Sequence, residues 1–519
     1  MMQHWPVLPV LLPLFTGALL IFMARAELNT QRWVSVISAL LGVPVSVVLL
    51  WQAQADTISV YNMGNWPAPF GIVLVIDRLS ALLLTMTAVL GLLALLFGMR
   101  GDDRFGRNYH ALFHFLLLGV QGAFMTGDLF NLFVFFEVLL IASYALLMHG
   151  AGPERTRASF HYVILNVAGS AIFLIGIGTL YGMLGTLNLA DLALRVSEVG
   201  PEDAPIIRAA GLIMLMAFGL KAAMLPMYFW LPAAYSAASP SVAALFAIMT
   251  KVGLYAILRV HGLLFGDHAG ALAGSMQIWL WILSIGTLTL AIIGLVAART
   301  LKRAVSYLVV ISVGTVLTTL AINDPNVLSG ALYYLIHSTF VVAGLYLLAE
   351  LIGAQRGTTR DYLTPAQPLA QPNTLGIMYF IGATAIIGLP PLSGFMSKVL
   401  IFRGTVTHPL APLLWTLLLL AGLIALITLV RAGSTLFWRT NRQPPTPRKA
   451  DPVKFGVTLV TLLFSPALAI WAEPVIQFTE SVALQLNAPW QYIDAVLGSG
   501  LNLAVDAPAL PPPLLGGQP

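Results

Sequence analysis

The chain has 519 residues, of which 58% are hydrophobic and 9% are charged, and its mean hydropathy is +0.88. Soluble domains carry about 25% charged residues, so this composition indicates a polytopic membrane protein. The chain contains no cysteine, which excludes disulfides, iron–sulfur ligation and thiolate catalysis on it. The net charge of +5 does not indicate a nucleic-acid partner, because the basic residues cluster on one side of the predicted membrane spans.

Apolar segments of about twenty residues, the length that a bilayer core requires, recur along the whole chain. They predict an all-α membrane protein with about 14 transmembrane helices, at residues 5–24, 33–52, 78–98, 109–126, 129–149, 160–184, 205–225, 238–261, 274–298, 304–322, 327–352, 375–405, 409–438 and 453–472. Proline or glycine in the seventh, eighth and twelfth segments predicts broken helices, the twelfth split at 388–394.

The basic residues predict the orientation of these spans. An even number of spans places both termini on one side, and with the N-terminus outside, the inner loops hold 17 of the 26 Lys and Arg residues. Five basic residues then fall in outer segments: Arg78, Arg195, Arg208, Arg259 and Arg403. The positive-inside rule therefore predicts a multi-pass protein of the bacterial inner membrane with both termini on the periplasmic side.

The breaks fall in corresponding places of two halves, which suggests two inverted repeats. The expected organisation is spans 1–3 at 1–108, a first repeat (spans 4–8) at 109–261, a second repeat (spans 9–13) at 262–440, and span 14 with a tail at 441–519. Residues 53–77 alternate and contain turn residues, which predicts an outer hairpin. The Pro-rich tail at 506–519 predicts disorder.

Residues 221–259 hold the strongest functional signal. Lys221 and Lys251 lie in apolar surroundings, and Pro226, Pro232 and Pro240 stand between them. Irregular backbone in a bilayer persists only where protein or water satisfies it, so we expect two broken helices around a hydrated interior. A buried lysine releases its proton more readily than an exposed one, whereas arginine stays charged. The alternative is that each lysine snorkels to an interface.

Glu137, His337 and Lys398 are further ionisable residues predicted at mid-span. Each charge at the bilayer centre costs roughly 2.5–3.5 kcal/mol, so a role in proton transfer is a reason for their presence. For Glu137 we expect a pairing with Lys221; the alternative is an acid hydrogen-bonded to a neighbouring helix. His337 is interpreted as a proton relay or as a packing residue, and Lys398, near Arg403, as a second mid-span lysine beside a break or as a snorkelling one.

The other membrane ionisable groups are less informative. His110 and His114 are expected at the interface, and Arg431 is expected to snorkel, while His161 and His261 stay ambiguous. The sequence holds no Walker A motif, dinucleotide fingerprint, haem site or metal-ligand cluster. We therefore expect no cofactor and a driving force from an ion gradient or a partner subunit; a metal site is left unknown.

Four groups of residues carry a family resemblance. They are Glu137 in FFEVLLIASY, the run from Lys221 through Trp230-Leu231-Pro232 and Ser239-Pro240-Ser241 to Lys251-Val252-Gly253, the stretch LKRAVSY at 301–307, and Gly388-Leu389-Pro390-Pro391 with Lys398. They resemble the antiporter-like subunits shared by respiratory complex I, membrane-bound hydrogenases and Mrp-type cation/proton antiporters. Among these, the chain is most similar to the D-type subunits of the Mrp (Pha/Mnh) multisubunit antiporters.

The resemblance implies a hydrated central axis. It implies an acid–lysine pair Glu137–Lys221, a bridging Lys251, and then His337 and Lys398. Position 398 is usually glutamate in the M-type subunit of complex I, so lysine argues against that branch. Many relatives carry a lysine four residues after the histidine where this chain has Val341, which places more of a relay on His337 and water.

We therefore expect a proton-translocating membrane subunit of a multisubunit Na⁺ or K⁺/H⁺ antiporter, a transporter subunit rather than an enzyme. Its expected partners are other large and small membrane subunits of an Mrp-type complex. The principal alternative is a proton-pumping subunit of complex I or a membrane-bound hydrogenase. An idle structural scaffold and a carrier of anionic solutes are further alternatives. The sequence leaves open which cation moves and whether its path lies in this chain.

Overall fold

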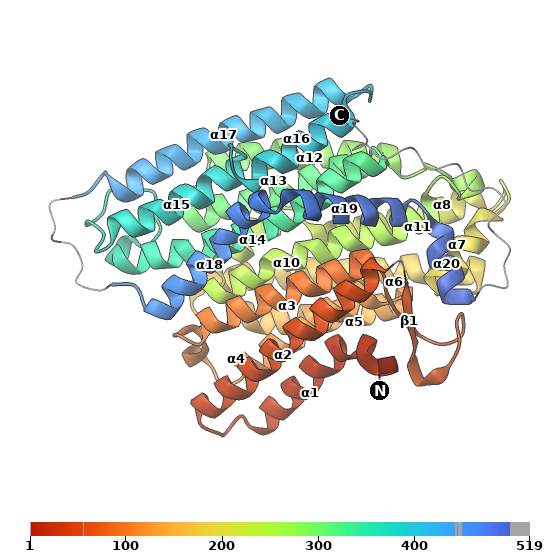
Figure 1. Ribbon diagram of the computed structural model, residues 1–519, viewed down its shortest axis with the longest axis horizontal. Helices are drawn as coiled ribbons and strands as arrows, with labels where there is room; N and C mark the ends of the chain where they lie inside the picture. The colour runs from red at the N-terminus through yellow and green to blue at the C-terminus, as the bar shows by residue number, and fades with distance from the viewer. Residues whose placement is uncertain (1, 56, 442–443, 445–448, 499–519) are drawn as a thin grey trace, which may run out of the picture.

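The computed structural model describes residues 2–55, 57–441, 444 and 449–498. Within them the chain forms a bundle of long, roughly aligned helices (Figure 1). The first half contains α1 Leu8–Phe22, α2 Leu28–Gln54, α3 Arg78–Gly98, α4 Tyr109–Met125, α5 Leu129–Met148, α6 Pro153–Leu184, α7 Leu189–Ser197, α8 Ala204–Ala222, α9 Trp230–Ala237, α10 Pro240–Ala256 and α11 Gly262–Phe265. The second half contains α12 Gln277–Val296, α13 Leu301–Leu320, α14 Pro325–Gln355, α15 Pro372–Ile387, α16 Ser393–Thr405, α17 Ala411–Phe437, α18 Pro452–Ile470, α19 Ala472–Leu486 and α20 Pro489–Leu497.

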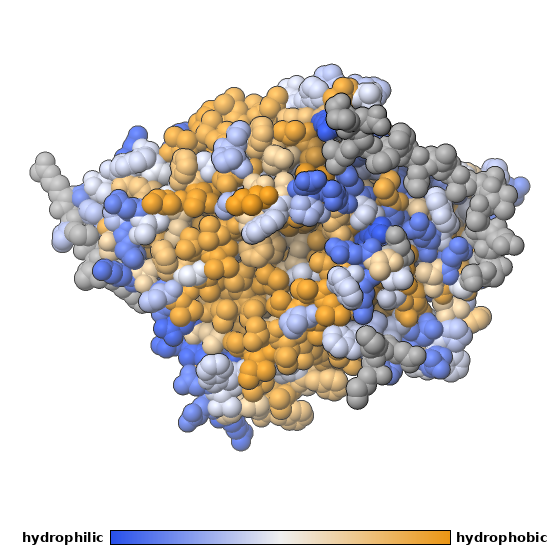
Figure 2. Space-filling view, in the orientation of Figure 1, coloured by the Kyte–Doolittle hydropathy of each residue, from blue (hydrophilic) through white to orange (hydrophobic). Residues whose placement is uncertain are grey.

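The prediction of an all-α membrane protein is confirmed. Twelve helical segments of the described chain are long and apolar enough to cross a membrane, and α4 and α15 are shorter apolar helices. These fourteen coincide with the fourteen predicted segments. An apolar band crosses the middle of the surface between more hydrophilic ends (Figure 2).

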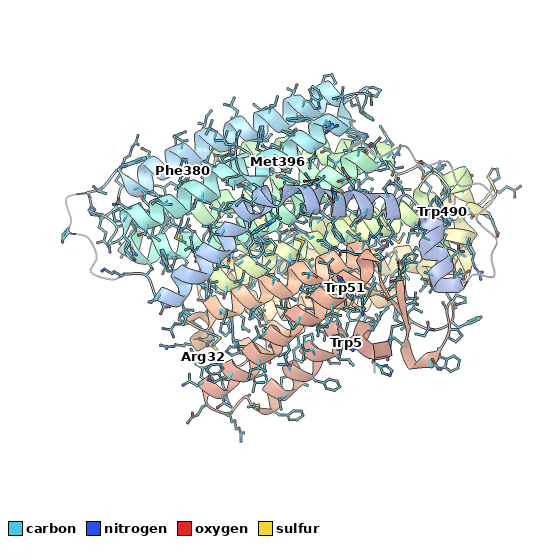
Figure 3. The ribbon with its side chains drawn as sticks, viewed as in Figure 1. Trp5, Arg32, Trp51, Phe380, Met396 and Trp490 are labelled. Atoms are coloured by element: carbon cyan, nitrogen blue, oxygen red, sulfur yellow. The ribbon has the colours of Figure 1, made fainter. Side chains whose placement is uncertain are left out.

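The bundle has two ends, named here after residues labelled in Figure 3. Arg32 lies at one end, and Trp5 and Trp490 lie toward the opposite end. The predicted hairpin is present: β1 Ser59–Asn62 pairs antiparallel with β2 Val73–Ile76, and it lies at the Trp490 end (Figure 1). The first helix of the chain begins at that end, and α20 lies there too.

The seventh span is broken as predicted, but the eighth is not. The helix α8 ends at Ala222, Ala223 has a φ of +61°, and the short helix α9 follows. Pro240 stands at the first position of α10, where a missing N–H costs no intrahelical hydrogen bond. The helix then runs on through a π-helical turn at Ile257–His261 into α11, so the prediction of a second break here was wrong.

The twelfth span is broken where the sequence predicts. The helix α15 ends at Ile387, Gly388 has a φ of +86°, and α16 begins at Ser393. Glycine reaches this left-handed conformation without steric cost.

Three helices were not predicted, namely α7, α19 and α20. The last membrane element is therefore longer than expected: α19 follows α18 almost directly, packs along α14, and leads to α20, which packs on α7 at the Trp490 end (Figure 1). Polar residues interrupt the apolar pattern of α19, and α7 and α20 have only nine residues each. The predicted tail at 506–519 lies outside the described residues.

The helices α10 and α14 form the centre of the bundle. In each, 94% of the apolar window is buried, against 28% for the peripheral helices α2 and α17. They pack against each other, so the helix that carries Lys251 adjoins the helix that carries His337.

Candidate functional site

Glu137 and Lys221 approach each other through a hydroxyl group. Glu137, on α5, accepts a short hydrogen bond from Ser170 Oγ on α6. Lys221 Nζ, on the last turn of α8, lies 3.5 Å from the same Ser170 Oγ. Both residues are described, and they form no ion pair within 4 Å. The geometry thus replaces the direct acid–lysine pair of the prediction with a carboxylate–hydroxyl–ammonium junction.

Lys221 lies at a small internal cavity. Its side chain is only 8% exposed, and Nζ donates to Asn166 Oδ1 at 3.3 Å. Asn166 is held in turn by its donation to the Tyr162 carbonyl at 2.9 Å, and Tyr162 and Trp230 also line the cavity. A buried ammonium needs such partners, because an unpaired charge in a low-dielectric interior is strongly unfavourable. The amide and hydroxyl oxygens are neutral and stabilise the ammonium less than a carboxylate would.

Lys251 is more deeply buried and has fewer partners. It is 1% exposed, and its Nζ donates to Thr250 Oγ1 at 3.4 Å. Two residues later, a Cβ on Gly253 would lie 2.4 Å from the backbone nitrogen of Ala222 and 2.8 Å from the carbonyl carbon of Lys221. Because Gly253 has no side chain, α10 can pack directly against the backbone of α8 at Lys221 and Ala222.

His337 begins a chain of hydroxyl groups. It is fully buried on α14, and its Nδ1 is 2.7 Å from Ser393 Oγ, at the start of α16. Ser393 Oγ is 2.8 Å from Ser465 Oγ on α18. His337 Nε2 is buried and has no hydrogen-bond partner among the described residues, so one ring nitrogen is engaged and the other is unpartnered.

Lys398 lies on the opposite side of its break from Lys221. Both lysines lie beside a break, as expected, but Lys221 precedes Ala223, whereas Lys398 follows Gly388 by ten residues. Lys398 Nζ reaches back across the break and donates to the Ile387 carbonyl at 2.6 Å. A cation at the C-terminal end of a helix is stabilised by the helix dipole and by the free carbonyls.

At the Arg32 end, two adjacent carboxylates differ in environment. Asp102 Oδ2 accepts hydrogen bonds from the backbone N–H (3.2 Å) and from the hydroxyl of Ser241, at the start of α10. Burial raises the pKa of Asp102, and these hydrogen bonds only partly offset it. Burial also tends to raise the pKa of Asp103, but the hydrogen bonds and charges of His110 and Arg32 outweigh it, and the pKa of Asp103 is lowered.

An ion pair between α13 and α14 lies at the same end. Lys302 Nζ on α13 lies 3.0 Å from Glu350 Oε2 on α14, and Asp361 Oδ2 accepts from the backbone N–H of Lys302 at 2.9 Å. His110 and His114, expected at the interface, lie on α4 in the half that begins at this end, and each is only 1% exposed.

Arg259, expected in an outer segment, lies at the Trp490 end in the helical turn that follows α10, and it is buried. Its Nη2 is 2.5 Å from Asp77 Oδ2, and the guanidinium lies over the rings of Tyr255 and Tyr492 at 5.4 and 5.1 Å. Arg78, also expected in an outer segment, is 9% exposed. Three further ionisable residues differ in exposure. His161 and Arg431 are exposed, and His261 is buried with a 3.1 Å hydrogen bond to the Gly211 carbonyl.

Sequence reasoning missed the polar neighbours of the ionisable residues. Asn166, Ser170, Ser393 and Ser465 contact Glu137, Lys221 or His337 directly or in one step. An asparagine inside an apolar span was a usable signal for the first, because such a side chain needs a buried partner. Single serines are too frequent in membrane helices to stand out.

Comparison with known proteins places this arrangement in a family. A family model described as "NADH:quinone oxidoreductase/Mrp antiporter, TM" matches residues 126–428, which include all five predicted site residues. The chain belongs to this family. The match confirms the resemblance drawn from the motifs around Glu137, Lys221, Lys251 and Lys398.

Curated relatives in this family are similar over nearly their whole length. A protein of Rhizobium meliloti, named as the probable D-type subunit of a K(+)/H(+) antiporter, is 40% identical over 96% of this chain and 98% of its own length. The D-type subunit of a Na(+)/H(+) antiporter from Bacillus subtilis is 38% identical over 96% and 100%. A chain of the Mrp complex from a Dietzia species has the same fold, with a TM-score of 0.85 at 23% identity over 96% of this chain and 99% of its own.

Proposed function

We propose that this protein is a proton-translocating membrane subunit of a multisubunit Na⁺ or K⁺/H⁺ antiporter, and that protons move through Glu137, Lys221, Lys251 and His337, with Lys398 acting beside this path as a positive charge. The observation that carries the proposal is the junction at Ser170, where a partly buried carboxylate and a buried lysine share one hydroxyl. The relatives named as D-type antiporter subunits support the same activity.

The chemistry follows from which groups can change their charge. When Glu137 is ionised and close, it favours the ammonium form of Lys221; when that support weakens, burial favours the neutral amine, and Lys221 gives up a proton. The close approach of α8 and α10 at Gly253 supports transfer toward Lys251. The packing of α10 on α14 supports the next step toward His337 through internal water.

The two halves of the bundle serve as the proposed inverted repeats, 109–261 and 262–440, flanked by 1–108 and 441–519. Their paired breaks at Ala223 and Gly388 support this division. We also propose a bacterial inner membrane location with the Trp490 end and both termini on the periplasmic side. Most basic loop residues then face the cytoplasm, as the positive-inside rule requires.

The partners are proposed to be other large and small subunits of an Mrp-type complex, in which a second subunit can supply the cation path. The family description also covers NADH:quinone oxidoreductase, so a redox-driven pump is the second candidate. Purification of the native complex distinguishes them: co-purifying iron–sulfur subunits would favour the second.

The test of the transport role uses the whole complex in inverted membrane vesicles. We expect Glu137→Ala and Lys221→Ala to abolish cation-dependent proton exchange while the complex still assembles on a native gel. Arg431→Ala, on an exposed side chain, is the control and should exchange normally. Normal exchange in both site variants would refute the proposal.

A further inference from the structure

A polar stripe on α14 lies between His337 and the Trp490 end. Ser329, Tyr333 and His337 are spaced four residues apart and therefore lie on one face of the helix. All three are at most 3% exposed. Polar side chains in register along a central, buried helix require partners at every step, because each unsatisfied group costs free energy.

Those partners come from the helices α16, α18 and α19. His337 contacts Ser393, and Ser393 contacts Ser465 on α18. Tyr333 donates its hydroxyl to the Leu468 carbonyl at 2.7 Å, near the end of α18. Ser329 Oγ is 3.0 Å from Thr479 Oγ1 on α19. The stripe is thus covered by α16 and α18, which the sequence predicts, and by α19, which it does not.

The stripe has a direction. Asp324 caps the start of α14, and the neighbouring Asn323 contacts Asp267, just beyond α11, at the Trp490 end. On α19, which packs against α14, Glu480 follows Thr479 directly and is partly exposed. Hydrophilic residues also gather over α19 and interrupt the apolar band (Figure 2). Going from His337 to Ser329, the stripe therefore leads from the bundle centre toward a hydrophilic surface.

We propose that this stripe, together with its partners Ser393, Ser465 and Thr479, is the outlet by which protons leave His337 for the Trp490 end. The inference rests on the proposed function and adds the exit route and the residues that form it. His337 takes up a proton at its unpartnered Nε2 and, as imidazolium, releases the Nδ1 proton to Ser393 Oγ; a turn of the ring then restores the Nδ1–H form for the next proton. Ser393 passes its own hydroxyl proton to Ser465, which passes one to water beyond, so each hydroxyl gains and loses one proton.

Lys398 has a defined part in this step. It lies five residues after Ser393 on α16, and its ammonium is held at the Ile387 carbonyl. A fixed positive charge on this helix opposes protonation of the imidazole and so favours release along the hydroxyls. The carbonyl of Leu468, near the end of α18, gives Tyr333 an acceptor that an uninterrupted helix would not leave free.

A water-accessibility experiment tests the route directly, because the chain has no native cysteine. Ser329→Cys, Ser465→Cys and the control Ser338→Cys are introduced singly in the full complex. Ser338 is fully buried on α14 beside His337, and its hydroxyl bonds within its own helix. A membrane-impermeant thiol reagent is added from the periplasmic side, and labelling of this chain is read as a gel shift.

We expect Ser329→Cys to label fastest, Ser465→Cys more slowly, and Ser338→Cys not at all. Labelling at Ser465 should also inhibit exchange. If Ser465→Cys labels no faster than Ser338→Cys, or labels only from the cytoplasmic side, the outlet is not here.

Removal of one hydroxyl provides a second, independent measurement. We expect Ser465→Ala to lower exchange about fivefold in an assembled complex and Ser465→Thr to restore it, since threonine keeps the hydroxyl. Equal exchange in the alanine and threonine variants would overturn the outlet. If Glu137→Ala and Lys221→Ala abolish exchange in the same vesicles while Ser465→Ala is silent, only the outlet fails; if all are silent, the proposed function fails.

Discussion

The helices α8 and α15 both end at a residue followed by one with positive φ, Ala223 at +61° and Gly388 at +86°. After Ala223, the freed groups are satisfied by neutral side chains: Trp230 Nε1 donates to the Leu220 carbonyl at 3.0 Å, and Leu225 N–H donates to Thr287. After Gly388, the freed Ile387 carbonyl accepts from the ammonium of Lys398.

The difference assigns distinct duties to two lysines that look alike in the sequence. Lys398 is bound to a helix end, where the dipole and a carbonyl favour its charged form. Lys221 points away from its own helix end, toward Asn166 and Ser170, and depends on a carboxylate that it does not touch. We infer that Lys221 changes protonation during transport and that Lys398 serves as a fixed charge.

Substituting arginine for Lys221 and for Lys398 tests the difference between the two lysines, and it is expected to have the largest effect on exchange. Arginine keeps a positive charge but does not release a proton at ordinary pH. We expect Lys221→Arg to lower cation-dependent proton exchange by about a hundredfold or more, the scale of losing an acid–base group. Lys398→Arg should stay within about a factor of two, because a guanidinium also donates to a helix-end carbonyl.

The measurement is initial exchange rate per assembled complex in vesicles, with Lys398→Met as the companion variant. The methionine variant removes the charge and leaves the Ile387 carbonyl without this donor, so it should be slower than the arginine variant. Comparable loss in Lys221→Arg and Lys398→Arg would mean that both lysines titrate.

A second prediction concerns the contact that brings Lys251 to the first break. A methyl group at Gly253 would meet backbone atoms of Ala222 and Lys221, which cannot rotate away. We expect Gly253→Ala to destabilise the complex by about 1–3 kcal/mol and to slow exchange, since α8 and α10 must separate.

Gly262→Ala is the matched control on the same membrane element, where an added Cβ meets nothing within 4 Å. Its thermal midpoint should equal or exceed that of the parent complex, because alanine is the better helix former. A Gly253→Ala complex as stable as Gly262→Ala would show that α8 and α10 adapt without cost.

A third prediction concerns pH and the start of α10 in the first half. The raised pKa of Asp102 means that the folded state binds this proton more tightly than the unfolded chain. Stability from Asp102 therefore falls as pH rises from its ordinary value of 3.8 and is lowest above the raised pKa. Asp102→Asn keeps an oxygen acceptor for Ser241, so it should raise the thermal midpoint more at about pH 9 than near pH 4, where the unfolded chain begins to lose this proton.

Asp103→Asn, one residue away, should change the thermal midpoint in the opposite direction, because the pKa of Asp103 is lowered. Its lowered pKa means that the ionised form contributes stability above the ordinary value, and this is lost as pH falls through the lowered pKa. The variant should therefore lower the midpoint at both pH values. A pH-independent effect of Asp102→Asn would show that the Asp102 carboxyl does not titrate in this window.

Much of this architecture could be predicted from residue patterns alone. Span-length apolar runs and the glycine–proline cluster at 388–391 predict the helices and one break, because the bilayer fixes the length of a span and proline removes a donor. The same rule failed at Pro240, because the ring costs nothing at the start of a helix. The buried position of Arg259 depends on Asp77 and Tyr492, which are far from it in the chain.

The connections within the site could not be predicted for a similar reason. Ser170 and Ser465 are ordinary residues until the fold places them beside Glu137 and Ser393. The helix α19 has mixed polarity, which is typical of a loop or an exterior helix unless its packing on α14 is known. Pairings between distant helices depend on tertiary packing that a single sequence does not encode locally.

The smallest expected effect concerns the two positions at which the breaks begin. An L-residue in the left-handed region costs about 1–2 kcal/mol, which glycine avoids. We expect Ala223→Gly to raise the free energy of unfolding by about 1 kcal/mol and Gly388→Ala to lower it by a similar amount. A Cβ at Gly388 would also come within 2.9–3.0 Å of the Lys398 side chain, which is flexible enough to shift. If the thermal midpoints of the two variants shift in the same direction, the left-handed conformation does not have the same energetic effect at the two breaks. If the shifts are opposite and of similar size, the two breaks have equivalent backbones, and their functional difference comes from Lys221 and Lys398.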